Sequence, residues 1–483
     1  MYKLSRFSSR LKPTLLALSL AFSTCAVADV DVASIAARLP QGASLGFVAK
    51  NLNQDQQIAA FNPQTFMLPA STQKVFTALA AKLTLGDDFR FETSLLTNGR
   101  VENGQLNGDL IARFSGDPDL TSGQLYNLLA ELKKQGINRI AGNLILDTSV
   151  FVGHDRGLGW IWNDLTLCFN SPPAAVNLDN NCFYVELDAN QPAGELVKFN
   201  VPAQFPVQVF GQVRVATKEE APYCQLDAVV HDNNRYQIKG CLSRQSKPFG
   251  LSFSVQDPDA YAAATIQRQL SRLGIAFNGS VQQPYQPQQG KLLAQHLSKP
   301  LPDLLKKMMK KSDNQIADAL FRTVAYHHYQ RPASFQLASL AMRQILQSKA
   351  GVKFGNSIIA DGSGLSRHNL IAPQAMLQAL EYIARHEDQL HLLETFPIAG
   401  TDGTLSGRGS MINAPLVKNI TAKTGALKGV YNLAGFMTNA RGERVAFVQF
   451  INGYSTGSDL ESKTKRAPLV QFESSLYNSI YKE

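Results

Sequence analysis

The sequence reads Ser71-Thr72-Gln73-Lys74 directly after Pro69-Ala70, where an apolar helix is expected to begin. A three-residue step on a helix brings the serine and the lysine to one face, close enough to hydrogen-bond. A serine hydroxyl needs an adjacent base before it acts as a nucleophile, and a lysine whose pKa is lowered can be that base. Taken alone, the pattern indicates a capped surface helix more often than a catalytic pair.

Two further short motifs follow along the chain. Ser312-Asp313-Asn314 lies between two helical stretches, and from a tight turn its serine and asparagine can both point into a cleft. The alternative is an ordinary helix N-cap, because these three residue types are the best capping residues. Lys423-Thr424-Gly425 is expected to open a strand, with Lys423 and Thr424 on opposite faces. A glycine there would let a substrate backbone approach closely.

The three motifs follow one another along the chain: Ser312 comes 241 positions after Ser71, and Lys423 comes 111 positions after Ser312. This trio is the signature of serine β-lactamases and penicillin-binding proteins. The chain resembles that superfamily, and the long first interval makes it similar to one group. That group is the class C low-molecular-mass penicillin-binding proteins, the D-alanyl-D-alanine carboxypeptidase/endopeptidases of the penicillin-binding protein 4 type (peptidase family S13). Residues 114–120, 162–164, 171–173 and 361–367 carry further likeness.

The resemblance implies an α/β multi-domain fold. A β-lactamase/transpeptidase-like domain, with an antiparallel sheet flanked by helices and an all-helical subdomain, is interrupted by two β-rich inserted domains. The changes in sequence texture place a signal peptide at 1–28, the transpeptidase-like domain at 29–86 and 290–483, the first inserted domain at 87–194 and 248–289, and the second, mostly β, at 195–247. Expected elements include a strand over 44–52, helices over 122–135, 257–273 and 467–481, and a hairpin of 430–438 with 445–452.

The resemblance also implies roles for the motif residues. Ser71 would form an acyl-enzyme, Lys74 would take its proton, and Ser312 would assist proton transfer to the leaving amine. Asn314, Lys423, Thr424 and Gly425 would line the cleft and hold the carboxylate side of the substrate, with Lys423 supplying a positive field. The oxyanion hole would be the backbone N–H groups of Ser71 and Ala426.

Family members build a pocket for the diaminopimelate arm of the stem peptide. Asp164, Phe169 and Arg367 match positions of that pocket, and Asp164 would pair with the free ammonium of the arm. The alternative reading of Asp164 is a turn residue near Cys168. Lys428 departs from the uncharged residue expected beside the third motif, which affects the expected substrate specificity.

The implied activity is that of a serine D,D-carboxypeptidase/D,D-endopeptidase acting on peptidoglycan stem peptides, with β-lactam antibiotics as covalent inhibitors. No cofactor and no metal are expected. A serine β-lactamase is one alternative, against which the large insertion and the lack of an evident Glu-bearing deacylation loop argue. A non-catalytic cell-wall-binding protein is another, against which the intact motifs argue.

The first 28 residues read as a secretory signal, with a basic start, an apolar run over 15–22 and an Ala26-Val27-Ala28 cleavage site. A lipoprotein anchored through Cys25 is the alternative, although Phe22-Ser23-Thr24 fits that poorly. The chain is therefore expected in the periplasm. The formal charge of +9 falls to 9 − 4 = +5 once the signal is removed, which is a mild excess, and the sequence has no dense Lys/Arg stripe. Nucleic-acid binding is not expected, and membrane contact is expected to be peripheral at most.

Four cysteines remain once the signal is removed, and an even number in an exported protein predicts two disulfides. Three pairings are possible. Pairing of sequence neighbours is the simplest and gives Cys168–Cys182 and Cys224–Cys241. A zinc site is the weaker alternative, because the sequence has neither C-x-x-C nor H-E-x-x-H spacing.

Overall fold

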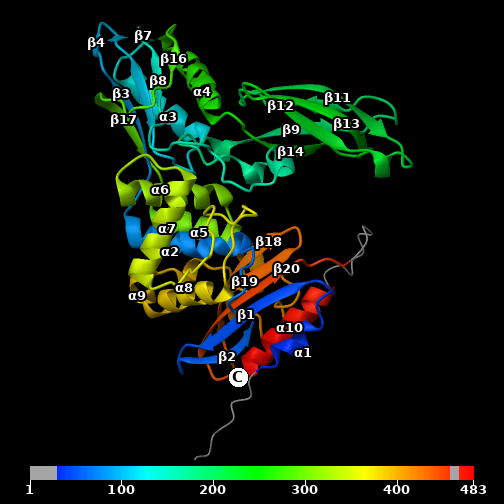
Figure 1. Cartoon of the computed structure of the whole chain (residues 1–483). Helices are drawn as coiled ribbons and strands as arrows, with labels where there is room; N and C mark the ends of the chain where they lie inside the picture. Colours follow the sequence, from blue (N-terminus) through cyan, green and yellow to red (C-terminus); the bar gives the residue numbers. More distant parts are fainter. Residues whose placement is uncertain (1–29, 457–466) are drawn as a thin grey trace, which may run out of the picture.

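The computed structural model describes residues 30–456 and 467–483. The predicted signal peptide and Cys25 lie outside these residues. Figure 1 shows a sheet domain at the bottom, a helical subdomain in the middle and a β-rich part at the top, from which a lobe of strands projects sideways. This multi-domain α/β arrangement agrees with the expected fold class. Within the described residues, no helix is both long and apolar enough to cross a membrane.

The sheet domain is built on five antiparallel strands in the order β18-β19-β20-β1-β2. Pairing of β1 with β20 joins segments from opposite ends of the chain. Lys423 lies in the middle of β18, so the expectation that it opens the strand was wrong. The predicted hairpin of β19 and β20 is confirmed. The strands are β1 (Ser44–Asn51), β2 (Gln56–Phe61), β18 (Ile420–Leu427), β19 (Val430–Thr438) and β20 (Arg444–Asn452).

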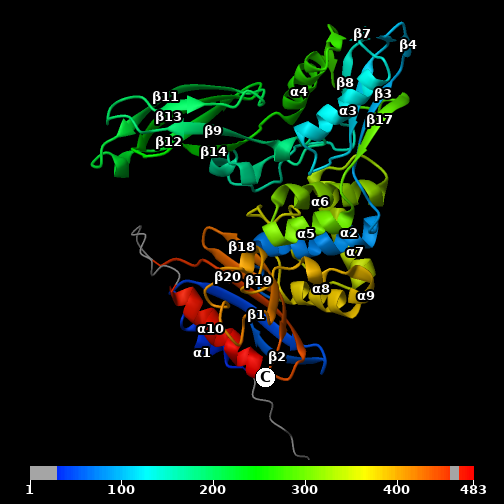
Figure 2. The same ribbon diagram turned by 180° about the vertical axis from the view of Figure 1, so that it is seen from behind.

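Alternating apolar residues give this sheet two buried faces. Phe47 and Phe447 pack against helices α1 (Val32–Ala36) and α10 (Ala467–Lys482). Their neighbours Val48 and Val448 belong to the core shared with the helical subdomain. The two helices cover one face of the sheet in both views (Figures 1 and 2).

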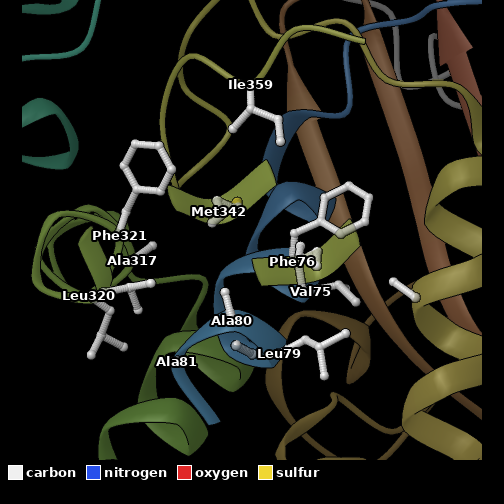
Figure 3. Packing of buried hydrophobic residues seen from close by; sticks show 14 of the residues in the cluster. Val75, Phe76, Leu79, Ala80, Ala81, Ala317, Leu320, Phe321, Met342 and Ile359 are labelled. Atoms are coloured by element: carbon white, nitrogen blue, oxygen red, sulfur yellow. The ribbon is translucent and has the colours of Figure 1, made fainter. Parts of the chain in front are cut away.

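The helical subdomain surrounds α2, in which every residue from Lys74 to Lys82 is buried. Such a helix is apolar on nearly all sides because it lies at the centre of the core. Figure 3 shows Val75, Phe76 and Leu79 packed among residues such as Leu320 and Met342 from neighbouring helices. The helices are α2 (Lys74–Leu85), α5 (Leu301–Lys311), α6 (Asn314–Tyr329), α7 (Phe335–Ala350), α8 (Pro373–Arg385) and α9 (Glu387–Leu390).

The first inserted part has a five-stranded sheet, β16-β8-β6-β3-β17, and a four-stranded sheet, β15-β7-β5-β4. Strand β17 pairs with β3, so this part extends to Leu297 and the expected return at residue 290 is too early. Helices α3 (Ser122–Lys134) and α4 (Pro258–Arg272) contribute to its core. The strands are β3 (Glu92–Thr97), β4 (Arg100–Glu102), β5 (Gln105–Asn107), β6 (Leu110–Phe114), β7 (Arg139–Ile140), β8 (Leu144–Asp147), β15 (Ala276–Phe277), β16 (Val281–Gln282) and β17 (Lys291–Leu297).

The projecting lobe consists of two three-stranded sheets, β10-β9-β14 and β11-β13-β12. Because β9 and β14 lie on either side of the expected segment 195–247, its two boundaries fall inside one sheet. Both predicted disulfides, Cys168–Cys182 and Cys224–Cys241, are present. The strands are β9 (Cys182–Asp188), β10 (Lys198–Asn200), β11 (Gln208–Ala216), β12 (Leu226–His231), β13 (Arg235–Ser243) and β14 (Phe249–Ser254).

Candidate active site

Ser71 lies in a tight turn that precedes α2. The turn is a 3₁₀ helix, Ala70–Gln73, and Ala70 has a positive φ of 47°. Gly364, with φ of 85°, lies directly over it: a Cβ added there would be 1.8 Å from the Ala70 carbonyl oxygen. A glycine is therefore required for the loop at 361–367 to cover the Ser71 turn.

The Lys74 ammonium touches three oxygens. Its Nζ lies 2.9 Å from Ser71 Oγ, 2.7 Å from Asn314 Oδ1 and 2.7 Å from the Ser363 carbonyl. The side chain is fully buried. Burial lowers the pKa of Lys74 to about 8, against the raising effect of nearby aspartates such as Asp318.

This geometry also sets the direction of the lone pair in the neutral amine. The Ser363 carbonyl can only accept hydrogen bonds, and so can Asn314 Oδ1. The asparagine cannot turn round freely, because its Nδ2 donates to the Phe169 carbonyl at 2.9 Å. When Lys74 loses a proton, its two remaining N–H groups stay on these acceptors. Its lone pair then faces Ser71 Oγ.

The second motif, Ser312-Asp313-Asn314, provides both a helix N-cap and side chains that point into the cleft. Ser312 ends α5 in the left-handed region, with φ of 59°. Asp313 caps α6, its side chain accepting from the Ile316 N–H at 3.0 Å. Because the middle residue does the capping, Ser312 and Asn314 are free to reach the two lysines, Lys423 and Lys74.

The third motif lies on β18, beside the Ser71 turn. Lys423 Nζ is 3.0 Å from Ser312 Oγ and 2.8 Å from the Thr424 carbonyl. Burial, and then the charge of Lys74, lower the pKa of Lys423 well below its usual range. Lys423 is thus buried behind Ser312, where it can polarise that hydroxyl. The Thr424 hydroxyl donates to Thr404 Oγ1 at 2.7 Å.

Gly425 was expected to let a substrate backbone approach closely, and this expectation needs correction. A Cβ on this residue would be 2.7 Å from the Pro69 carbonyl oxygen and 3.2 Å from the Ala70 Cβ. The backbone that approaches it is therefore the protein's own Ser71 turn, and not a substrate. Gly425 lets β18 pack against the nucleophile turn.

The expected pocket residues line one cavity beside the motifs. Asp164 comes from a short 3₁₀ helix, Trp162–Asp164, and Phe169 from another, Cys168–Asn170. The Arg367 guanidinium donates to the Lys428 carbonyl at 3.3 Å from both terminal nitrogens. The lining residues are Ile161, Asn163, Asp164, Phe169, Asn170, Leu365, Arg367, Ala426, Leu427 and Lys428. The wall thus carries one acidic and two basic side chains.

Sequence reasoning missed two parts of this site. The Ser363 carbonyl is a backbone group, which no residue type reveals. Asp318, buried in α6, carries no motif of its own. The only available signal was an aspartate one helical turn after Asn314, on the same face as that residue.

Comparison with known proteins relates the chain to one family. The sequence model of the D-Ala-D-Ala carboxypeptidase 3 (S13) family matches residues 28–476. The chain is 72% identical over 482 residues to D-alanyl-D-alanine carboxypeptidase DacB of Haemophilus influenzae, covering 100% of both. A crystal structure of penicillin binding protein 4 (dacB) from H. influenzae matches with a TM-score of 0.92 at 74% identity, covering 94% of this chain and 100% of that one. A structure of that protein complexed with a novel beta-lactam matches with a TM-score of 0.88 at 71% identity, with the same coverage.

Proposed function

Because the chain belongs to the D-Ala-D-Ala carboxypeptidase 3 (S13) family, we propose that it cleaves D-alanyl peptide bonds of peptidoglycan stem peptides through an acyl-enzyme on Ser71. The bond cleaved joins the penultimate D-Ala to the next residue. Where that residue is a terminal D-Ala, the chain acts as a carboxypeptidase. Where it is a cross-linked diaminopimelate, the chain acts as an endopeptidase and remodels the cell wall.

The contact between Lys74 Nζ and Ser71 Oγ, at 2.9 Å, carries this proposal. Neutral Lys74 takes the Ser71 proton as Oγ attacks the carbonyl carbon. The backbone N–H groups of Ser71 and Ala426 stabilise the oxyanion. Ser312, polarised by Lys423, passes a proton to the leaving amine, and water then releases the acyl group.

Recognition of the substrate involves the cavity beside the nucleophile. Asp164 pairs with the free ammonium of the diaminopimelate arm and Phe169 packs along its methylene chain. Arg367 and Lys428 line the same cavity. Thr424, on β18, binds the terminal carboxylate side of the substrate. β-Lactams, one of which is present in a related H. influenzae structure, acylate the same serine.

The periplasm is the proposed location, because residues 1–28 read as a cleavable secretory signal and stem peptides lie outside the inner membrane.

Three assays test the function. Incubation with pentapeptide and cross-linked muropeptides, followed by chromatography, should reveal released D-Ala and separated cross-links. Ser71→Ala should abolish both products and labelling by a fluorescent penicillin. Release of D-Ala by Ser71→Ala at the wild-type rate would refute the assignment of Ser71 as the nucleophile. Rapid turnover of a chromogenic cephalosporin, with no D-Ala release, would indicate a β-lactamase instead.

A further inference from the structure

Asp318 is a buried carboxylate whose charge acts on the catalytic lysine, Lys74. It lies on α6, one helical turn beyond Asn314, and is completely inaccessible to solvent. Its Oδ1 accepts hydrogen bonds from two successive backbone groups, the Gly362 N–H at 2.7 Å and the Ser363 N–H at 3.0 Å. The next peptide carbonyl, that of Ser363, is the one that touches Lys74. Asp318 therefore holds the segment that presents an acceptor to the ammonium.

A second carboxylate fixes the same segment from the other side. Asp361 accepts from the Gly364 N–H at 2.8 Å. That N–H belongs to the same peptide group as the Ser363 carbonyl, so holding it directs the carbonyl the opposite way, towards Lys74. Both oxygens of Asp361 are occupied, since they also accept from Ser366 N–H, Asn369 Nδ2 and Trp160 Nε1.

Asp318 differs from Asp361 in its second carboxylate oxygen, Oδ2. Its Oδ2 is buried and accepts no hydrogen bond of normal geometry from the residues that the structure describes, although the Ser363 hydroxyl favours the charged form of the carboxylate. A buried carboxylate oxygen without a partner is costly, so it needs an explanation beyond loop support. The charged groups that face Asp318 are Lys74 on α2, Asp361 in the loop and Arg322 on its own helix. Lys74 in turn faces Asp313 and, on β18, Lys423.

We propose that Asp318 is a positioning residue for Lys74: one oxygen holds the Ser363 carbonyl against the ammonium, and the carboxylate charge sets the proton affinity of the amine. The inference rests on the proposed function, because it assumes that neutral Lys74 is the base. Burial and then Asp361 raise the pKa of Asp318 to about 8, close to that of Lys74, so the carboxyl gains its charge over the same pH range in which Lys74 loses its proton. Because each group acts electrostatically on the other, the two titrate as a pair.

The pH dependence of penicillin acylation in Asp318→Asn tests this role. The amide keeps an oxygen for the two N–H groups and puts its NH₂ where Oδ2 has no partner, so the loop is retained while the charge is lost. Removing a negative charge makes protonated Lys74 less favourable. The midpoint of the rise in acylation rate should therefore move to lower pH by about one unit.

Thr77→Val is the matched control. The Thr77 hydroxyl donates to the Gly362 carbonyl at 2.7 Å, so this variant loosens the same loop without changing its charge. It should lower the plateau rate and leave the midpoint where it is in the wild type. A midpoint in Asp318→Asn equal to that of the wild type would overturn the inference and leave Asp318 a purely structural role.

A second measurement covers the case in which Asp318→Asn does not fold. Infrared difference spectra of the wild type, labelled at aspartate carboxyl carbons, should contain a protonated-carboxyl band that is lost near pH 8. In Lys74→Met that band should persist to higher pH, because coupling between two sites is reciprocal. A band unmoved by Lys74→Met would also overturn the inference. Failure of the wild type to be acylated at Ser71 would instead refute the proposed function itself.

Discussion

Lys74 combines two properties that normally exclude one another. It is completely buried, which disfavours its charged form, yet its ammonium has an acceptor for each of its three N–H groups. The first property makes deprotonation accessible near neutral pH. The second fixes the lone pair on Ser71 Oγ once the proton has left. A surface lysine at the same spacing from a serine would have neither property, because water would solvate and reorient it.

The pH dependence of acylation follows from the lowered pKa of Lys74. Its neutral form is the active base, and the pKa is about 8. The rate of penicillin acylation should rise about tenfold per pH unit well below that value and level off above it. Stopped-flow labelling between pH 6 and pH 10 measures this directly. A rate that is constant or falls between pH 6 and pH 8 would exclude neutral Lys74 as the base.

Lys74→Arg should separate charge from base strength. An arginine keeps the positive charge but does not deprotonate in proteins, so acylation should fall by about 10²–10⁴-fold. Lys82→Arg is the matched control, because Lys82 lies two turns along the same helix and pairs with Asp87 at 2.5 Å. It should retain the wild-type rate. Equal losses in the two variants would point to damage of α2 rather than loss of a base.

Residue types and their order predicted the motif side chains of the site, but neither its backbone groups nor the carboxylate of Asp318. Ser71, Lys74, Ser312 and Lys423 are brought together as expected. The Ser363 carbonyl was not predicted, because every residue carries such a group and only the folded loop selects one. Gly425 was expected to admit a substrate, since nothing in the sequence indicates that β18 packs against the Ser71 turn.

At the scale of elements, the contact between two loops determines the position of the nucleophile. The Ser71 turn lies under the loop at 361–367, and Gly364 is the point of closest approach. Secondary structure with strong local patterns, such as the hairpin of β19 and β20, was predictable. The pairing of β17 with β3 was not, because it joins segments about 200 residues apart and neither strand specifies its partner.

Gly364→Ala should be markedly destabilising. Its Cβ would collide with the Ala70 carbonyl, and its φ of 85° disfavours any side chain. The free energy of unfolding should fall by about 3–5 kcal/mol, and acylation should be lost. Gly351→Ala, with φ of 68° but no atom within 4 Å of the added Cβ, isolates the cost of backbone conformation, about 1–2 kcal/mol. Similar melting temperatures for the two variants would contradict the proposed contact.

At the scale of the whole molecule, the inserted part contributes directly to the catalytic site. The Phe169 carbonyl fixes the Asn314 amide, and the Cys168–Cys182 disulfide ties this segment to β9. Arg322, fully buried on α6, also joins the two parts through Asp155 at 2.9 Å. The expected boundaries at 195 and 247 did not reveal this connection. A β-rich sequence indicates that the lobe is made of strands, but it does not indicate that β9 pairs with β10 and β14.

Replacing Cys168 and Cys182 together by serine should therefore affect catalysis from outside the cleft. The Phe169 carbonyl would be held less firmly, and the Asn314 amide could turn over. Acylation should slow by about tenfold, which corresponds to the free energy of one hydrogen bond. Serine at both Cys224 and Cys241, a disulfide of the projecting lobe, is the matched control and should leave the rate unchanged. Equal effects of the two pairs on the acylation rate would argue against this link.

Mass spectrometry of the protein after brief incubation with benzylpenicillin tests the central claim most directly. Opening of the β-lactam ring by Ser71 Oγ adds the whole antibiotic to the protein, because no part of it leaves. The predicted result is one such adduct per chain, on the peptide containing Ser71, and none in Ser71→Ala. An adduct on a different residue, or the same mass increase in Ser71→Ala, would contradict the assignment of Ser71 as the nucleophile activated by Lys74.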